Sequence, residues 1–273
     1  MFRAPTIKTR TRTIFSMAEV TYHSTVRNLR SGHRSAVIGL ALTTLQSLVM
    51  VGVFLLMFTL LGVRTAQIRG DFLLFLMSGI FLYMTHTKTV AAVAGGGNPL
   101  GAMMLHAPMN TVISIVAAAV STLYQQVFAI TVILSFYHIV IAPITIHDPV
   151  GALGMLLLAW FFGIAVGMVF LALNPWIPDF AGLVRALYIR MNMIASGKMF
   201  VVNTLPAMTV ALFDWNTLFH IIDQSRGHVF LHYTPRVTSV SYPIYVSLAL
   251  IMIGLMGEFY TRRNVSVSWY AAR

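Results

Sequence analysis

The sequence predicts an all-α integral membrane protein, and three observations carry that prediction. Only 9% of the 273 residues are charged, and 58% are hydrophobic. A soluble domain carries about 25% charged residues. The charges gather in clumps and are separated by long uncharged runs, such as 35–63 and 89–147. Because a spanning helix needs about 20 apolar residues, the longer run has room for more than one passage.

We expect six membrane-spanning helices between a basic segment (1–35) and a C-terminal tail (264–273), so that the membrane domain is 36–263. The stretch "TLPAMTVALF" between the last two spans is apolar but too short to cross alone. It predicts a re-entrant or interfacial piece. The six predicted spans are 36–63, 72–94, 112–141, 150–173, 183–205 and 242–260.

The distribution of Lys and Arg predicts that both termini are cytoplasmic. In that orientation 13 of the 18 basic residues lie inside and five lie outside. An excess of Lys and Arg on the cytoplasmic side is the usual pattern of membrane proteins. The net charge of +11 mostly reflects this bias, and it is weak evidence for nucleic-acid binding.

The basic segment contains a predicted amphipathic helix over 14–34, at the cytoplasmic membrane surface. A loose apolar stripe runs along it, and Arg27, Arg30 and Arg34 follow helical spacing. Such a helix binds lipid headgroups. A functional interpretation, compatible with the first, adds docking of a cytoplasmic partner or gating of a pore entrance.

Three cations lie in the predicted fifth span, "LVRALYIRMNMIASGKMFVV": Arg185, Arg190 and Lys198. A cation in the middle of the bilayer costs at least about 2.5–3.5 kcal/mol unless it faces water or protein. At about 100° per residue, Arg190 and Lys198 lie about 80° apart around one helix and can share a flank. We expect Lys198 to face a water-filled or polyanion-lined path and Arg185 to snorkel to the interface. For Arg190 and Lys198, the alternative is that the side chain snorkels to the membrane interface.

The stretch "WNTLFHIIDQSRGHVFLH" (215–232) is unusually polar for this chain. We interpret it as an amphipathic helix at the outer membrane surface, broken near Gly227. Asp223 and Arg226, three residues apart, are expected to point outward and to pair. The side facing protein or lipid is expected to carry Trp215, Leu218, Phe219 and Ile222.

Catalytic signatures are absent from the sequence. No G-x-x-x-x-G-K, H-E-x-x-H or G-x-S-x-G pattern occurs, and only seven residues are acidic. An alternative of another class is a metal-dependent intramembrane enzyme. In that alternative His228 and His232, four residues apart, bind a metal with Asp223 or His220 as a third ligand.

The order of features resembles the membrane permeases of the ABC-2 exporter family, in particular those that export capsular polysaccharide. The resemblance covers about 14–263. A basic helix leads into "SAVIGLALTTLQSLV", followed by "FLLFLMSGIFLYMTHTKTV", "NPLGAMMLHAP", "FFGIAVGMVFLALNPWIPDF" and a last span ending "YTRR". Its most specific piece is "WNTLFHIIDQSR", where Thr217 stands in place of the usual proline. The matching residues there are Asn216, Leu218, His220, Asp223 and Arg226.

The resemblance implies a homodimeric permease in a bacterial inner membrane, paired with two copies of a separate ATPase. This chain then needs no cofactor, while the partner binds ATP and Mg²⁺. The implied cargo is a lipid-linked acidic polysaccharide that crosses through a channel lined by the first and fifth spans, with periplasmic and outer-membrane proteins as further partners. The residues expected along this path are Arg190, Lys198, Arg185, Tyr188, Phe54 and Phe58.

The loop between the second and third spans is the implied ATPase contact. Asn98 and Pro99 can start a short helix, and its methionines suit an adaptable apolar surface. A loop that touches only lipid is the alternative. The residues assigned to this coupling loop are Asn98, Pro99, Leu100, Met103, Met104, His106 and Pro108.

Other functions remain open at this point. An ABC-2 permease for another cargo, such as O-antigen, a teichoic-acid-like polymer, a lipid or a drug, would have the same fold. A channel or secondary carrier that works without an ATPase is a further alternative, although the sequence shows no convincing symmetry between halves.

Overall fold

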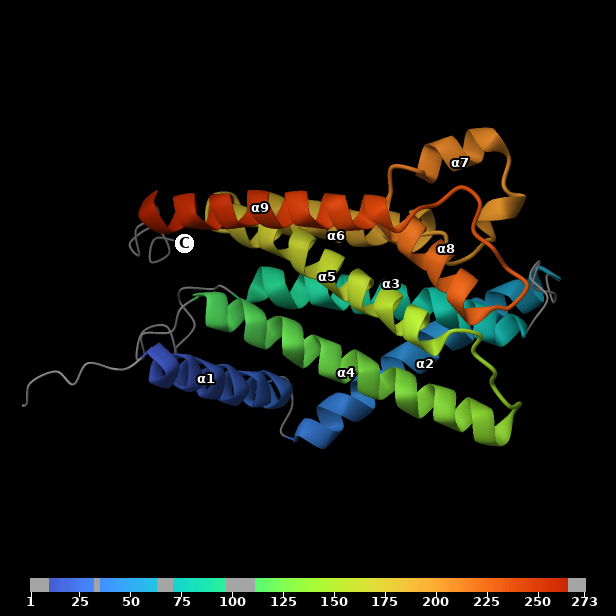
Figure 1. Ribbon diagram of the computed structural model, residues 1–273, viewed down its shortest axis with the longest axis horizontal. Helices are drawn as coiled ribbons and strands as arrows, with labels where there is room; N and C mark the ends of the chain where they lie inside the picture. The colour runs from blue at the N-terminus through green and yellow to red at the C-terminus, as the bar shows by residue number, and fades with distance from the viewer. Residues whose placement is uncertain (1–9, 32–34, 63–70, 97–110, 265–273) are drawn as a thin grey trace, which may run out of the picture.

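The structure, a computed structural model, describes residues 10–31, 35–62, 71–96 and 111–264. This part of the chain is all-α, as predicted, and contains nine α-helices and one 3₁₀ turn. The long helices run roughly along one axis as a bundle, with α3 and α5 in its middle (Figure 1). The bounds of these two helices are Phe72–Gly95 and Pro149–Leu173.

Within the described residues, five helices are long and apolar enough to cross a membrane. They correspond to the predicted first, second, third, fourth and sixth spans, and their ends lie within a few residues of the predicted ones. Besides α3 and α5, they are α2 (Ala36–Leu60), α4 (Thr111–Val140) and α9 (Ser241–Asn264).

Two aspartates fix the starts of the central helices. The side chain of Asp71 accepts a hydrogen bond from the Leu73 amide at the start of α3, and that of Asp148 accepts one from the Gly151 amide at the start of α5. An N-cap of this kind satisfies an amide that has no partner within the helix. These acids therefore mark the helix ends as well as the polar edge of the bundle.

Glycines bring α5 close to its two main neighbours. A Cβ on Gly163 would lie 2.8 Å from the Cβ of Thr89 in α3, and one on Gly167 would lie 2.7 Å from the Cβ of Val93. On the α9 side, a Cβ on Gly254 would lie 2.7 Å from the Cβ of Met168. Small residues allow such close packing between membrane helices, where dispersion replaces the hydrophobic effect.

The predicted fifth span is wrong in its extent. The helix there, α6 (Pro178–Ala195), ends ten residues before the predicted limit. Gly197 follows the helix end with φ of +75°, a conformation that favours glycine and commonly stops helices. The chain then makes a 3₁₀ turn (Val202–Thr204) and a short helix, α7 (Ala207–Phe213), which lies in the stretch "TLPAMTVALF" and has no buried residue.

The first and last described helices lie at the same end of the bundle. Figure 1 shows α1 (Arg10–Ser31) and the end of α9 there, together with the end of α3 and the start of α4. The α1 helix packs along the first half of α4.

Candidate functional site

A buried polar cluster gathers at the opposite end of the bundle, around α8 (Thr217–Val229). This helix lies against both α5 and α3, and Leu218, Phe219 and Ile222 are buried as predicted. The expected outward position of Asp223 and Arg226 is wrong, because both side chains are 0% exposed. Neighbouring helices cover the polar face of α8 as well as its apolar face, and the helix continues unbroken through Gly227.

Arg226 holds the turn that follows α6. One terminal nitrogen donates hydrogen bonds to the carbonyls of Gly197 (2.9 Å) and Phe200 (2.6 Å). The other donates to the carbonyl of Lys198 (2.8 Å), and the guanidinium lies 4.0 Å from the ring centroid of Phe75. The rigid fork of donors in Arg suits several acceptors at once. Arg226 thus supplies donors to main-chain oxygens left free where the helix stops.

Asp223 has other partners than the predicted one. Its carboxylate accepts hydrogen bonds from the hydroxyls of Tyr233 and of Thr238, the latter at 2.7 Å. Burial, and then the neighbouring carboxylate, raise the pKa of Tyr233, which keeps that hydroxyl a donor. Asp223 therefore ties the segment after α8 to the bundle, and the predicted ion pair with Arg226 is replaced by these separate networks.

Lys198 lies inside the bundle. Its side chain is 1% exposed, and its ammonium lies 3.5 Å from the ring centroid of Tyr83 and 4.7 Å from that of Phe54. Among the residues that the structure describes, Nζ has no hydrogen-bond partner. Gly79 of α3 makes room for this turn, because a Cβ there would lie 2.8 Å from the Cβ of Lys198. Two aromatic rings thus cover a buried cation.

Further polar contacts join α3, near Lys198, to α6. The hydroxyl of Tyr83 donates to the carbonyl of Ile189, and His86 is 2.9 Å from the hydroxyl of Tyr188. The imidazole of His86 stacks on Phe162 at 4.6 Å. His86 was not among the predicted site residues, although an isolated histidine within an apolar span is itself a signal of a specific contact.

Two asparagines connect α6 to α8. Asn216, the N-cap of α8, accepts a hydrogen bond from the Leu218 amide. Its side-chain amide donates to Asn192 Oδ1 (3.1 Å) and to the carbonyl of Ala195 (3.0 Å). His220 contacts Asp214 through Nε2 and accepts from the Ser239 amide. Asn216 therefore joins α6 to α8, whereas His220 contacts the segments on either side of α8. Trp215 is 61% exposed.

The residues predicted along a path separate into two groups. Phe54 and Lys198 meet in the buried cluster, and Tyr188 approaches it through His86. Phe58 is half-buried and contacts Phe72. Arg185 is half-buried and Arg190 is exposed on α6. Because α6 ends before Lys198, the predicted common helical flank of Arg190 and Lys198 does not exist.

Two further groups of predicted residues are the arginines of the N-terminal helix and the coupling loop. Arg27 is exposed on α1, and Arg30 lies in the same helix. Arg34 and the whole predicted coupling loop, Asn98 to Pro108, lie outside the described residues.

The histidines proposed as metal ligands have other surroundings. His228 Nδ1 is 2.9 Å from Asp148 Oδ2, and α8 ends at Val229, so His232 is not on the same helix. The Gly151 amide and, less strongly, His228 hold the pKa of Asp148 below its usual range. Within the described part of the chain, no three acidic or histidine side chains converge as a metal site.

Comparison with known proteins adds no relative. No protein family and no curated protein matches this sequence.

Proposed function

We propose that this chain is the membrane subunit of an ATP-driven exporter that moves a lipid-linked acidic polysaccharide. It works as a homodimer with two copies of a separate ATPase. The resemblance of the sequence to ABC-2 permeases suggests this class, and five helices able to cross a membrane are compatible with it. In this proposal α6 and the turn that follows it make the sixth passage.

The observation that carries the proposal is the ammonium of Lys198. A buried cation costs free energy unless it is paired, and here only the rings of Tyr83 and Phe54 face it within the described part. Phe54 belongs to α2, the helix on the outer side of the cluster. A movement of α2 takes this ring away and presents the cation to an anionic group of the cargo.

The exposed faces of α2 and α6 support a channel between two copies. In an apolar 18-residue stretch of α2, only 22% of the residues are buried. On α6, Arg190 is exposed. A second copy facing these helices would enclose a path that has cations along α6 and, behind α2, Lys198. This places the path where the first and fifth spans were predicted to line it.

The coupling region is proposed at the end of the bundle that carries α1. The ends of α3 and α4 that flank the loop 97–110 lie there, beside α1 and the end of α9 (Figure 1). An ATPase bound at this cytoplasmic end would contact several helix ends at once. Nucleotide binding by the partner can then move α2 through these contacts.

A charge-removing variant tests the role of Lys198. We expect Lys198→Met to keep or raise stability, because an apolar side chain of similar size replaces an unpaired buried cation. Export of the acidic polymer to the surface of cells that carry only this variant is expected to fall at least about tenfold, the effect of about 1.4 kcal/mol on a barrier.

The matched control is Lys88→Met, which removes another lysine of the bundle, one that donates to Gln46 Oε1 at 2.8 Å. Export is expected to stay near the wild-type level in this control. Wild-type export by Lys198→Met would remove the lysine from the transport path. Transport by the purified chain in vesicles without any ATPase would contradict the proposal as a whole.

The proposed dimer can be tested because the sequence contains no cysteine. Leu56 is 61% exposed on α2, so Leu56→Cys is expected to give a covalent dimer on oxidation of cell membranes. Leu157→Cys, on α5 and 40% exposed, is the control and is expected to stay monomeric. Equal crosslinking of the two variants would argue against α2 as the interface.

A further inference from the structure

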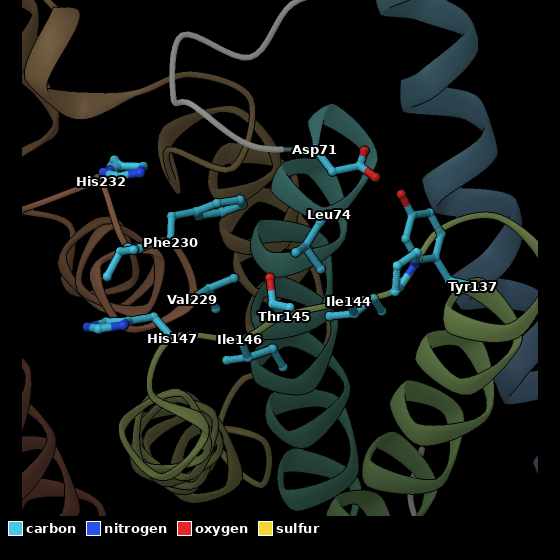
Figure 2. Close-up of a pocket in the computed structure, with 12 residues that line it drawn as sticks. Asp71, Leu74, Tyr137, Ile144, Thr145, Ile146, His147, Val229, Phe230 and His232 are labelled. Carbon is cyan, nitrogen blue, oxygen red and sulfur yellow. The ribbon is translucent and has the colours of Figure 1, made fainter.

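A polar cavity opens at the end of the bundle where α3 begins and where α4 and α8 end. Its volume is about 520 Å³, within the range of ligand sites. Figure 2 shows its lining side chains, which come from the ends of these three helices, from the segment between α4 and α5 and from the residues that follow α8. The polar members are Asp71, Tyr137, Thr145, His147 and His232.

An apolar slot of about 200 Å³ lies beside this cavity, toward the inside of the bundle. The two share Leu74, Ile146 and Val229, and the slot is otherwise lined almost entirely by apolar side chains of α3, α4 and α5. A third hollow, on α4, shares Leu134 and Ile146 with the slot. The slot therefore lies between helices that can cross the membrane, where the surrounding phase is lipid.

We propose that the cavity and the slot together bind one phospholipid with an ammonium headgroup. The headgroup occupies the polar cavity, and one acyl chain enters the slot between α4 and α5. A polar cavity beside an apolar slot, with three lining residues in common, matches an amphiphile, whereas a sugar or a free ion would leave the slot unused. This inference is independent of the transport function and requires only that the long helices cross a bilayer.

The charges around the cavity favour an ammonium over an anionic headgroup. Among the described lining residues, Asp71 is the one acidic side chain, and Lys and Arg are not among them. One carboxylate oxygen accepts from the Leu73 amide, which leaves the other for a ligand. In Figure 2 the hydroxyl of Tyr137 points toward this carboxylate.

The imidazoles suit the phosphate of the same headgroup. His147 and His232 both line the cavity and are exposed, so each can donate a hydrogen bond to a phosphate oxygen. A zwitterionic phosphoethanolamine headgroup satisfies the carboxylate and the imidazoles together. A purely anionic headgroup would face the Asp71 carboxylate without a compensating cation among the described lining residues.

The test uses the full chain in detergent and an equal mixture of phosphatidylethanolamine and phosphatidylglycerol with identical acyl chains. Native mass spectrometry then counts the lipids retained. We expect retention of one phosphatidylethanolamine, favoured about fivefold over phosphatidylglycerol, as for one exposed charge pair. Retention of no lipid, or a preference for phosphatidylglycerol, would overturn the proposal.

Two variants locate the bound lipid. Leu153 is 51% exposed at the rim of the slot, so Leu153→Trp covers the entrance without adding bulk to the core, and it is expected to abolish retention of both lipids. Leu157→Trp, one turn further along α5 and outside the slot lining, is the matched control and is expected to bind normally. Normal binding by Leu153→Trp would overturn the assignment.

Asp71→Asn tests the headgroup separately. Asn caps helices as well as Asp does, so the start of α3 is retained while the charge is removed. This variant is expected to keep a bound lipid but to lose the preference for phosphatidylethanolamine. An unchanged preference would contradict the role of the carboxylate.

Discussion

The neighbouring helices α3 and α2 have similar lengths but opposite surroundings. In an apolar stretch of 18 residues from each helix, 89% of the residues of α3 are buried, but only 22% of those of α2. The buried side of α3 includes Ser78, Thr85 and His86, whereas Leu56 and Leu60 on α2 are exposed. In a membrane, polar groups are expensive on the lipid side and apolar groups are not. Polarity, more than hydrophobicity, therefore distinguishes the inside of this bundle from its surface.

Helix contacts in this bundle are also of two kinds, apolar and polar. The seam between α3 and α5 depends on glycine and close packing, while the end of the bundle near α8 depends on hydrogen bonds. The hydrogen bonds made there favour one arrangement, since another arrangement leaves the same buried groups without partners. The difference predicts that removal of a single donor near α8 costs more than a single steric change along α5.

The largest expected effect follows from Arg226→Met. The variant leaves the carbonyls of Gly197, Lys198 and Phe200 without this donor, and each unsatisfied buried acceptor costs about 1–3 kcal/mol. We expect a loss of about 3 kcal/mol or more in the free energy of unfolding, measured by denaturation in detergent. Arg236→Met, at an exposed position, is the control and is expected to change it by less than about 0.5 kcal/mol.

Recovery by lysine would sharpen this prediction. Arg226→Lys keeps the charge but lacks the planar fork, so it is expected to restore stability only in part. A stability near wild type in Arg226→Met would mean that the turn after α6 does not depend on these hydrogen bonds. The contrast between the two regions would then fail.

A smaller effect is expected at the α3–α5 seam. In Gly163→Ala the new methyl meets the Cβ of Thr89 at 2.8 Å and the His86 carbonyl at 2.9 Å. We expect a loss of about 1–3 kcal/mol by overpacking, measured in the same unfolding assay. Gly154→Ala on the same helix has no atom within 4 Å of its new methyl and is expected to be neutral or stabilising by up to about 1 kcal/mol. Equal effects of the two changes would exclude close packing as the cause.

Much of the fold follows from local sequence signals. Uncharged runs bounded by residues such as Asp71 and Asp148 predicted five of the long helices, because span length and N-caps are local properties. The early end of α6 at Gly197 was missed, since the apolar residues around it read as a continuous span. The signal was a glycine followed by a proline nine residues later, at Pro206.

The buried cluster was harder to predict because its contacts are distant in sequence. An amphipathic pattern in α8 indicates a helix with a polar face, and in water that face points outward. Here Arg226 and Asp223 turn inward because main-chain oxygens of the turn after α6, and hydroxyls of the segment after α8, satisfy them. Lys198 was predicted to face a transport path, whereas the structure shows it covered by aromatic rings that come from two other helices.

The smallest expected effect concerns the edge of the bundle, where Asp148 caps α5 and contacts His228. Its pKa is lowered in the folded state, mainly by the Gly151 amide, from the value of about 3.9 for an unfolded aspartate. The carboxylate therefore stabilises the fold above that pH and loses this contribution as the pH falls through the folded-state pKa.

Asp148→Asn keeps a capping oxygen but does not ionise. We expect the wild type to have a slightly higher Tm than this variant at pH 6, with the difference vanishing toward pH 3. A difference independent of pH would show that the charge of Asp148 adds nothing at this exposed edge, in contrast to the buried cluster beside it.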